Sequence, residues 1–511
     1  MASVAGRSRI AKRTRQSIDK PSGGMRNFPN RVICPRKPES GGKMFDGLSD
    51  RRIDRYFPAV IVLYFSIQLA MRLSIGPTLE LDEAETFWQS QTLDFGYGPQ
   101  PPLYNWIQWG FSELFGRNLF SVAALKASIL SATLFCIFRF LRGSGIAAAA
   151  ACIGTLSLGL MPDILWESQR ALTHSVLAVC LSAVALLTFL RVAQHGRRID
   201  YLVFGAVLGL GVISKFNFVF LIGGLVGAAI LLKDLRTSIN PQRLVLTAIV
   251  AISVASPALY FYATLMKGTM GSVHKLSIVS DRSFANFLHL SGDFADALAG
   301  VYALPGAVLL GFAFARRKWS SSQPIMKPEL LRWTALIAIL LALILSVAVN
   351  ATEFKGRWFV PFSWPLVVYF TVIVWANLHS GGQGRLSFLL CSLWALAVIA
   401  LPYASLVSPG YRNADFSRVL SHIRPGDVVA SDSIWLLGNL SLKNGKMNVL
   451  QFVGHDAPVA DIELLGVADD APGVTVAGLG FTQGAMVAVP YGNGEKRFVV
   501  RRMVRQPLPL D

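Results

Sequence analysis

Long apolar segments alternate with short polar ones over most of this chain. A membrane-spanning helix needs about 20 predominantly apolar residues, and eleven segments come near that length. They lie at roughly 57–75, 119–141, 145–161, 175–193, 200–214, 216–232, 244–265, 298–315, 331–350, 358–377 and 386–406. The pattern therefore predicts a polytopic α-helical membrane protein with about 11 transmembrane helices.

The fifth and sixth segments are the shortest and are separated only by Lys215. They could instead form one long kinked span, which would reverse the orientation of every later segment. The basic residues of the later loops would then lie on the wrong side of the membrane. Two separate spans are therefore expected.

The distribution of charge predicts how the chain is oriented. Residues 1–55 contain 14 Lys and Arg against 5 Asp and Glu, so the N-terminus is expected in the cytoplasm. With that start, most other basic clusters also fall in cytoplasmic loops, at 139–142, 191–198, 233–236, 316–318 and 379–385. An odd number of spans then places the C-terminal residues outside.

Composition supports a membrane protein and argues against a soluble domain or a nucleic-acid-binding protein. Hydrophobic residues make up 53% of the 511 residues and charged residues only 15%, with a mean hydropathy of +0.48, unlike a soluble domain. Half of the net charge of +18 lies in residues 1–55 and much of the rest in short loops, so no nucleic-acid partner is expected. The five cysteines are far apart without metal-binding spacing.

Three domains are expected. Residues 1–55 read as a basic, disordered cytoplasmic arm, which either enforces topology or binds anionic membrane lipids. Residues 56–407 form the transmembrane domain. Residues 408–511 contain short alternating runs such as VVASDS and AMVAVPY between Gly and Pro, which predict a small α/β extracytoplasmic domain.

The first outer loop, residues 76–118, is unusually acidic and aromatic. Its core is ELDEAETFWQSQTLDFGYGPQPPLYNW, at 80–106. Carboxylates at a membrane boundary are costly unless they face water or a polar cavity, so Asp82 and Glu83 are functional candidates. Pro101 and Pro102 fix a rigid turn before the amphipathic segment YNWIQWGFSELFG.

Later outer loops add both acids and cations. Asp163, Glu167 and Arg170 are spaced to share one helical face, and His174 follows them; a lone histidine is more often a hydrogen-bonded residue at a helix end. Lys215 is either a snorkelling lysine or a phosphate ligand. Arg357 offers a planar fork for phosphate oxygens.

Acids and cations on one side of a polytopic protein suggest a reaction on a lipid-linked phosphate ester. A carboxylate can accept the proton of an acceptor hydroxyl, while Lys and Arg stabilise the charge on the departing phosphate. The alternative is a transporter or flippase of lipid-linked sugar intermediates. Transporters often contain two related halves, and the sequence shows no such internal repeat. A silent scaffold that docks a partner is a third possibility.

The first loop resembles that of the GT-C glycosyltransferases of the dolichyl-phosphate-mannose protein mannosyltransferase type, including lipid A aminoarabinose transferases and rhizobial galacturonosyltransferases. The matching residues are Asp82-Glu83, Phe87-Trp88, and Tyr97 through Pro101-Pro102-Leu103. The segments ending at Lys215 and around Arg357 also look like family landmarks. The similarity covers most of residues 55–405.

The resemblance implies an inverting membrane glycosyltransferase that uses a polyprenyl-phosphate-sugar donor. It implies Asp82 as general base and Glu83 as its neighbour, with Lys215, Arg357 and Arg170 holding the donor phosphate. The acceptor would be a lipid, as in lipopolysaccharide or lipid A, or a protein hydroxyl. The reaction would occur at the periplasmic face of a bacterial inner membrane.

The chain departs from the family pattern in the second outer loop. Many relatives have an Asp where this chain has His174, so either His174 substitutes for it or Asp163 or Glu167 takes the function. Gln100 replaces a frequent histidine before Pro101-Pro102. Some relatives bind a metal, and His274 and His289 are available, but their spacing is not diagnostic; no metal or other cofactor is predicted to be required.

Overall fold

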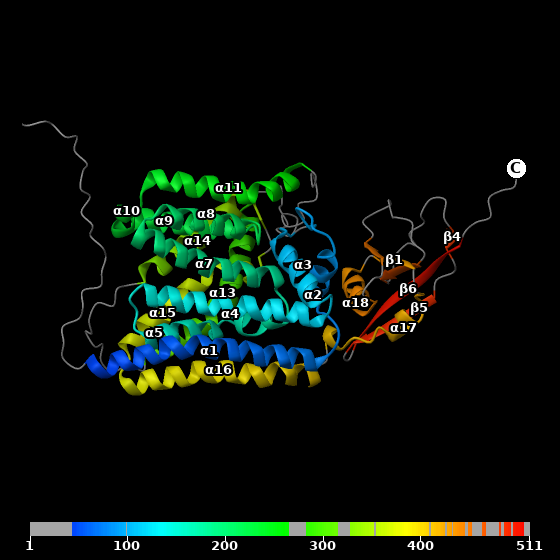
Figure 1. Ribbon diagram of the computed structural model, residues 1–511, viewed down its shortest axis with the longest axis horizontal. Helices are drawn as coiled ribbons and strands as arrows, with labels where there is room; N and C mark the ends of the chain where they lie inside the picture. The colour runs from blue at the N-terminus through cyan, green and yellow to red at the C-terminus, as the bar shows by residue number, and fades with distance from the viewer. Residues whose placement is uncertain are drawn as a thin grey trace, which may run out of the picture. The chain divides into compact units, whose positions relative to one another are not determined.

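The computed structural model describes residues 43–511 apart from 99, 265–282, 315–327, 352–353, 408–409, 425–426, 432, 445–447, 452–461, 467–479, 482–484, 492–493 and 505–511. Within these ranges the chain is mostly helical, with a small sheet near its C-terminus (Figure 1). The predicted fold class, a polytopic helical membrane protein with a small C-terminal α/β domain, is confirmed.

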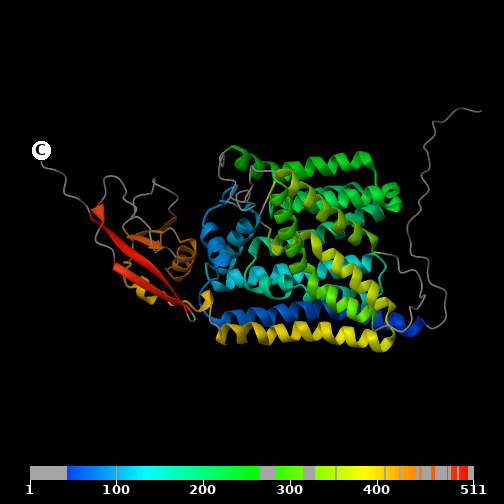
Figure 2. The same ribbon diagram turned by 180° about the vertical axis from the view of Figure 1, so that it is seen from behind.

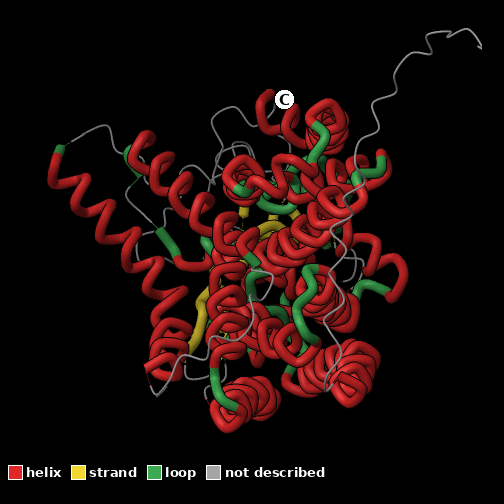
Figure 3. The backbone as a smooth tube through the Cα atoms, turned by 90° about the vertical axis from the view of Figure 1, so that its left-hand side faces the viewer, coloured by secondary structure: helices red, strands yellow, loops and turns green. Residues whose placement is uncertain are grey.

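The long helices run side by side, and Figure 3 views many of them end on. Helices α1 and α16 lie next to each other along one edge in Figures 1 and 2. The long helices are α1 Lys43–Ile75, α4 Leu119–Gly143, α7 Thr173–His195, α11 Pro241–Thr264, α13 Phe284–Phe314, α14 Glu329–Val349, α15 Val360–Asn377 and α16 Ser380–Val407.

Shorter helices lie between these long ones or follow the last of them. They are α2 Leu81–Gln89, α3 Leu103–Phe115, α5 Ala148–Leu156, η1 Ser157–Leu160, η2 Asp163–Glu167, α6 Ser168–Arg170, α8 Arg198–Val212, α9 Phe218–Leu231, α10 Lys233–Ser238, η3 Gly356–Trp358, η4 Tyr411–Asn413, α17 Ser417–Leu420 and α18 Ile434–Asn444. Helices α2 and α3 occupy the first outer loop, as the amphipathic pattern predicted.

The number of membrane spans differs from the expectation. Each of the eleven predicted segments falls on a helix, but only eight described helices are long and apolar enough to cross a membrane. A ninth would be the pair 148–160 and 163–170, which is bent by 86°. Helices α8 and α9, with 15 and 14 residues, would each measure only about 22 Å at 1.5 Å per residue, so eleven complete spans remains a prediction. The two helices are nevertheless separate.

The first long helix begins earlier than the sequence indicated. Helix α1 begins at Lys43, inside the segment 1–55 that was predicted to be a disordered arm. Ion pairs provide the physical reason: Arg142 at the end of α4 lies 2.7 Å from Asp54 and 3.4 Å from Asp50. These two carboxylates attach this part of α1 to the helical body, so residues 43–55 are helical and not a disordered arm. Residues 1–42 lie outside the described chain.

The C-terminal domain contains a mixed six-stranded sheet. Its path runs β2-β1-β3-β6-β4, and β5 pairs with β6. Strand β1 is parallel to β2 and β3, whereas β6 is antiparallel to β3, β4 and β5. The strands are β1 Val428–Ser431, β2 Asn448–Gln451, β3 Ile462–Gly466, β4 Gly480–Phe481, β5 Ala485–Tyr491 and β6 Gly494–Val504.

Helix α18 of this domain packs directly on α2 of the first outer loop. The backbones approach so closely that a Cβ atom added at Gly438 would lie 2.2 Å from the carbonyl oxygen of Ala84. Asn439 accepts a hydrogen bond from the backbone N–H of Leu79 at 2.7 Å, and Trp435 donates one to the Leu79 carbonyl at 3.0 Å. The C-terminal domain therefore fixes the residues that lead into α2.

The substitution Gly438→Ala tests this contact. The added methyl group would collide with backbone rather than with a flexible side chain, so we expect it to lower the free energy of unfolding by about 1 to 3 kcal/mol. The matched control is Gly110→Ala in α3, where a Cβ atom would meet nothing within 4 Å and helix propensity favours alanine. Thermal unfolding of the purified protein in detergent measures both. Equal unfolding temperatures for the two variants would contradict a tight contact between α18 and α2.

Candidate active site

Two neighbouring acids on α2 point into different environments. Successive residues of an α-helix project about 100° apart, because one turn takes 3.6 residues. Glu83 is buried, with 2% of its side chain exposed, whereas Asp82 is only partly buried. One helix therefore presents one carboxylate to the protein interior and the other to an accessible surface.

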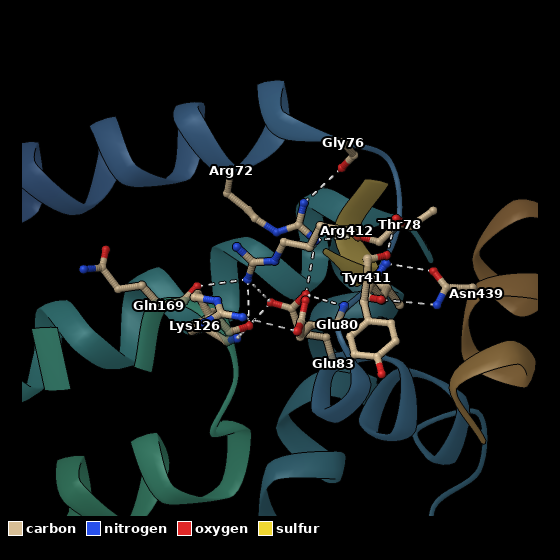
Figure 4. A network of polar contacts seen from close by, with 12 residues as sticks. Arg72, Gly76, Thr78, Glu80, Glu83, Lys126, Gln169, Tyr411, Arg412 and Asn439 are labelled. Atoms are coloured by element: carbon tan, nitrogen blue, oxygen red, sulfur yellow. Dashed lines mark hydrogen bonds and ion pairs between the residues drawn. The ribbon is translucent and has the colours of Figure 1, made fainter. Parts of the chain in front are cut away.

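Glu83 lies at the centre of a buried ion cluster that also contains Arg72, Lys126 and Arg412 (Figure 4). Its Oε1 accepts from Lys126 Nζ at 2.8 Å and from Arg412 Nη2 at 3.0 Å. Its Oε2 accepts from Arg72 Nη2 at 3.2 Å and from the backbone N–H of Glu80 at 3.1 Å. Both oxygens thus have two donors each, so the carboxylate is fully satisfied within the fold.

The cluster keeps Glu83 ionised. Burial alone would raise the pKa of its carboxyl group, but the positive charges of Arg412, Lys126 and Arg72 outweigh burial and hold the pKa well below the ordinary range. Removing one partner from such a buried set leaves an uncompensated charge and is costly. The cluster therefore joins α1, α2, α4 and the segment after α16.

The same cations also fix the second outer segment. Arg412 donates to the backbone carbonyls of Gln169 and Arg170, and Lys126 donates to that of Arg170 at 3.4 Å. The Arg170 guanidinium, 41% exposed, lies 3.7 Å from Glu80 and 3.2 Å from Glu167. Burial raises the pKa of Glu80. Arg170 and Glu167 therefore belong to the rim of the ion cluster.

Asp82 contacts the loop that leads into α7. Its Oδ2 accepts a hydrogen bond from the backbone N–H of Leu172 at 3.0 Å. Leu172 has a φ of +60°, a left-handed conformation that is uncommon for a leucine. Nearby, the hydroxyls of Thr86 and Thr173 are 3.2 Å apart. Asp82 thus helps to hold a strained turn beside the N-terminus of α7, and such strain is concentrated at functional sites.

The first turn of α7 also receives the predicted cation Lys215. Its ammonium group donates to the hydroxyl of Ser175 at 2.5 Å. His174, 7% exposed, has its ring 5.5 Å from that of Tyr104. Burial, together with the charges of Glu83 and Asp82, raises the pKa of the Tyr104 hydroxyl. Asp82, Lys215 and His174 are therefore brought together around a single helical turn.

Asp163 and Arg357 are the remaining predicted site residues near this turn. Asp163 and Ser175 both line a narrow cavity with apolar walls. Arg357 and Lys215 act on the Asp163 carboxylate through their positive charges. Arg357 is exposed and follows Gly356, at which an added Cβ atom would lie 3.9 Å from Asp163 Oδ2. Lys215 is thus placed near Asp163 through Ser175, and Arg357 through the adjacent Gly356.

The proline turn anchors the first outer loop near Lys215. Tyr97 and Gln100 pair across the turn, and the hydroxyl of Tyr262 donates to the Gln100 carbonyl. Pro102 is the residue before α3, and the backbone N–H of Leu103 donates to the Ile213 carbonyl at 3.1 Å. Pro101 and Pro102 thus end the loop against the C-terminus of α8.

The sequence pattern did not identify three residues of the ion cluster, Arg72, Lys126 and Arg412, as site residues. Lys126 carried a usable signal, because an ionisable residue inside an apolar span is a functional candidate. Arg72 resembles an ordinary basic residue at the end of a span. Arg412 is 329 positions from Glu83, so no local pattern connects them.

No described part of the chain offers a ready metal site. Among the described residues, no group of three or more His, Cys, Asp or Glu side chains could hold an ion. His289 lies 3.5 Å from Asp293 on the same helix, in an exposed position, and His274 lies outside the described residues.

The depressed pKa of Glu83 predicts loss of stability in acid. A carboxyl group whose pKa is lowered by folding stabilises the fold above its unfolded pKa, about 4.3 for Glu, and this contribution is lost as the pH falls below that value toward the folded pKa. We therefore expect the unfolding temperature of the wild type to fall with pH below about 4.3. Unfolding followed by intrinsic fluorescence between neutral and acidic pH measures this.

Glu83→Gln removes the titration as well as the charge. At neutral pH we expect the free energy of unfolding to fall by about 3 kcal/mol or more, because three buried cations lose their carboxylate. We also expect the unfolding temperature of this variant to fall less steeply with decreasing pH than that of the wild type. Glu113→Gln, at an exposed position of α3, is the control and should change neither quantity. If the unfolding temperature of Glu83→Gln fell as steeply in acid as that of the wild type, other groups would cause the pH dependence.

Comparisons with known proteins show what this chain is similar to. Residues 99–261 match the family model described as dolichyl-phosphate-mannose-protein mannosyltransferase. The chain is 29% identical to the lipopolysaccharide core galacturonosyltransferase RgtB of Rhizobium johnstonii, over 77% of this chain and 82% of that protein. It is 28% identical to the lipopolysaccharide core galacturonosyltransferase RgtA of the same organism, over 75% and 79%.

A solved structure shares the fold. The crystal structure of ArnT from Cupriavidus metallidurans bound to undecaprenyl phosphate aligns with a TM-score of 0.59 at 14% identity, over 88% of this chain and 99% of that chain. The family match, the two relatives and the shared fold confirm the resemblance seen in the first outer loop. Together they support a membrane glycosyltransferase that is similar to the dolichyl-phosphate-mannose protein mannosyltransferases and shares the fold of the ArnT structure.

Proposed function

We propose that this glycosyltransferase moves a sugar from a polyprenyl-phosphate donor to a hydroxyl of lipopolysaccharide or lipid A, with inversion at the anomeric carbon. The observation that carries the proposal is the convergence on the first turn of α7. Asp82, a partly exposed carboxylate, contacts Leu172, and Lys215 contacts Ser175 within the same turn. A base and a phosphate ligand are thus available side by side.

The similar proteins support the choice of substrates. The two Rhizobium relatives are named for galacturonosyl transfer to the lipopolysaccharide core, and the ArnT structure contains undecaprenyl phosphate. A galacturonosyl donor and a lipopolysaccharide acceptor are therefore the first pair to test. A protein hydroxyl remains the alternative acceptor.

Asp82 would act as the general base. As the acceptor oxygen forms a bond to the anomeric carbon, its proton passes to the Asp82 carboxylate, and the bond from that carbon to the phosphate oxygen breaks. The polyprenyl phosphate leaves with the electron pair. A single displacement of this kind inverts the anomeric configuration.

Lys215 and Arg357 would hold the donor phosphate. Both cations act on Asp163, and the N-terminal end of α7 adds a partial positive charge. Arg170 is a weaker candidate than the sequence suggested, because its guanidinium is already shared between Glu80 and Glu167. His174 would shape the site through its contact with Tyr104.

Glu83 would position the site rather than touch substrate, because its side chain is buried and has four donors. Residues 56–407 would form the catalytic domain, and residues 408–511 a periplasmic domain that holds α2 in place. We further propose a bacterial inner-membrane location with the N-terminus in the cytoplasm. The multi-span fold and the similar proteins support the inner membrane.

Asp82→Asn tests the general base. Asparagine keeps an oxygen that can accept the hydrogen bond from Leu172, so the turn before α7 should remain intact while the base is lost. We expect kcat for sugar transfer to fall by about 10² to 10⁴, with an unchanged unfolding temperature. Transfer of radiolabelled sugar from the polyprenyl-phosphate donor in proteoliposomes measures the rate.

Asp94→Asn is the matched control, an exposed acid of the same outer loop. It should leave the transfer rate unchanged. Full activity in Asp82→Asn would exclude Asp82 as the base. Donor translocation without transfer by the wild type would instead favour a flippase.

Lys215→Met and Arg357→Met test the phosphate site. Each removes a charge-assisted interaction of about 1.5 to 3 kcal/mol, so we expect the KM for the donor to rise roughly tenfold or more while the KM for the acceptor is unchanged. Lys233→Met, an exposed lysine at the start of α10, serves as the control. An unchanged donor KM in both variants would remove the phosphate role.

A further inference from the structure

A cavity lies against the ion cluster of Glu83 and is not needed for the reaction proposed above. One part of its wall is polar and contains Arg72, Lys126 and Arg412. The remaining wall is largely apolar and comes from the long helices α1, α4 and α16, through side chains that include Phe65, Leu130 and Leu401. Its volume is about 40 Å³, so it admits a small charged group at the polar end.

The polar end carries more positive than negative charge. Three buried cations surround the single carboxylate of Glu83. Glu80 is the next acid, and even when it is ionised the cations exceed the carboxylates by one. Gln169, which also lines the cavity, is neutral. Because an uncompensated charge is costly away from water, the cluster favours a further anion.

Two arginine side chains at the polar end of the cavity have unused hydrogen-bond donors. Arg72 and Arg412 are each more than nine-tenths buried, with 8% and 9% of the side chain exposed. The Nε atom of each is buried and has no hydrogen-bond partner among the residues that the structure describes. Buried polar groups are nearly always paired. Figure 4 shows both guanidinium groups in the same cluster as Glu83.

We propose that this cavity binds the anionic headgroup of an amphiphile. A phosphate or carboxylate oxygen accepts hydrogen bonds from Arg72 and Arg412, which offer planar donor groups suited to oxyanions. The apolar part of the ligand follows the side chains of α1, α4 and α16. A free oxyanion would satisfy the arginines but would leave the apolar wall without a partner, which is why a lipid is favoured.

This site is separate from the donor phosphate site assigned to Lys215 and Arg357. The cavity that holds Asp163 and Ser175 shares only Phe65 and Leu130 with this one, and neither side chain is charged. Occupancy here does not require sugar transfer. The inference therefore stands whether or not the proposed reaction is correct.

Native mass spectrometry of the full-length protein in a neutral detergent tests the proposal. The probes are phosphatidylglycerol, which is anionic, and phosphatidylcholine, which has no net charge. Ala127→Phe fills the cavity without changing any charge, since Ala127 lines it. Ser128→Phe, at an exposed position one residue further along α4, adds the same ring outside the cavity and is the matched control.

We expect the wild type and Ser128→Phe to retain phosphatidylglycerol over phosphatidylcholine, and Ala127→Phe to lose that preference. The double variant Arg72→Lys, Arg412→Lys keeps the charges beside Glu83 but removes the Nε donors. We expect it to bind phosphatidylglycerol at least about tenfold more weakly, as the loss of one charge-assisted hydrogen bond implies.

Three results would overturn the proposal. The first is equal retention of the two lipids by the wild type, and the second is an undiminished preference in Ala127→Phe. The third concerns the source of the oxyanion, which inorganic phosphate tests in the same preparations. If inorganic phosphate raises the unfolding temperature of the wild type and no lipid is preferred, the ligand is a free anion and not a headgroup.

Discussion

The buried carboxylate of Glu83 forms the ion pairs on which the end of the helical body that carries α2 depends. It joins side chains from α1, α4 and the segment after α16 to the helix that carries Asp82. Ions buried in this way stabilise a fold only when every partner is present, because each one left alone keeps its full desolvation cost. The ion cluster of Glu83 therefore specifies one arrangement of these segments and disfavours others.

Asp82 gains its position from this arrangement. Glu83 turns one face of α2 inward, so its neighbour is directed to the strained turn at Leu172. Arg412 and Lys126 fix the backbone just before that turn through the carbonyls of residues 169 and 170. The proposed base and the loop that it contacts are thus held by two of the same cations, Arg412 and Lys126.

The segment after the last long helix contributes to the site although it lies far away in sequence. Arg412 completes the ion cluster, and α18 contacts Leu79 and Ala84 at the start of α2. This explains why a membrane enzyme would keep a small α/β domain at the surface where its reaction is proposed to occur.

The sequence predicted those features that depend on local pattern. Apolar length located the helices, and acids beside a span marked Asp82 and Glu83. It could not distinguish the buried Glu83 from the accessible Asp82, because that difference arises from cations on three other segments. Arg72 and Arg412 have no local signal, and the bend of 86° after η1 depends on packing. The ion pairs that attach Asp50 and Asp54 of α1 depend on Arg142, a partner that lies far along the chain.

The anomeric configuration of the product tests the central claim most directly. The full-length enzyme would be given a polyprenyl-phosphate galacturonosyl donor of known configuration and a lipopolysaccharide acceptor, and the new glycosidic bond would be examined by NMR. A single displacement assisted by Asp82 predicts the configuration opposite to that of the donor. A product with the donor's configuration would require a covalent intermediate or another mechanism, and would contradict the role given to Asp82.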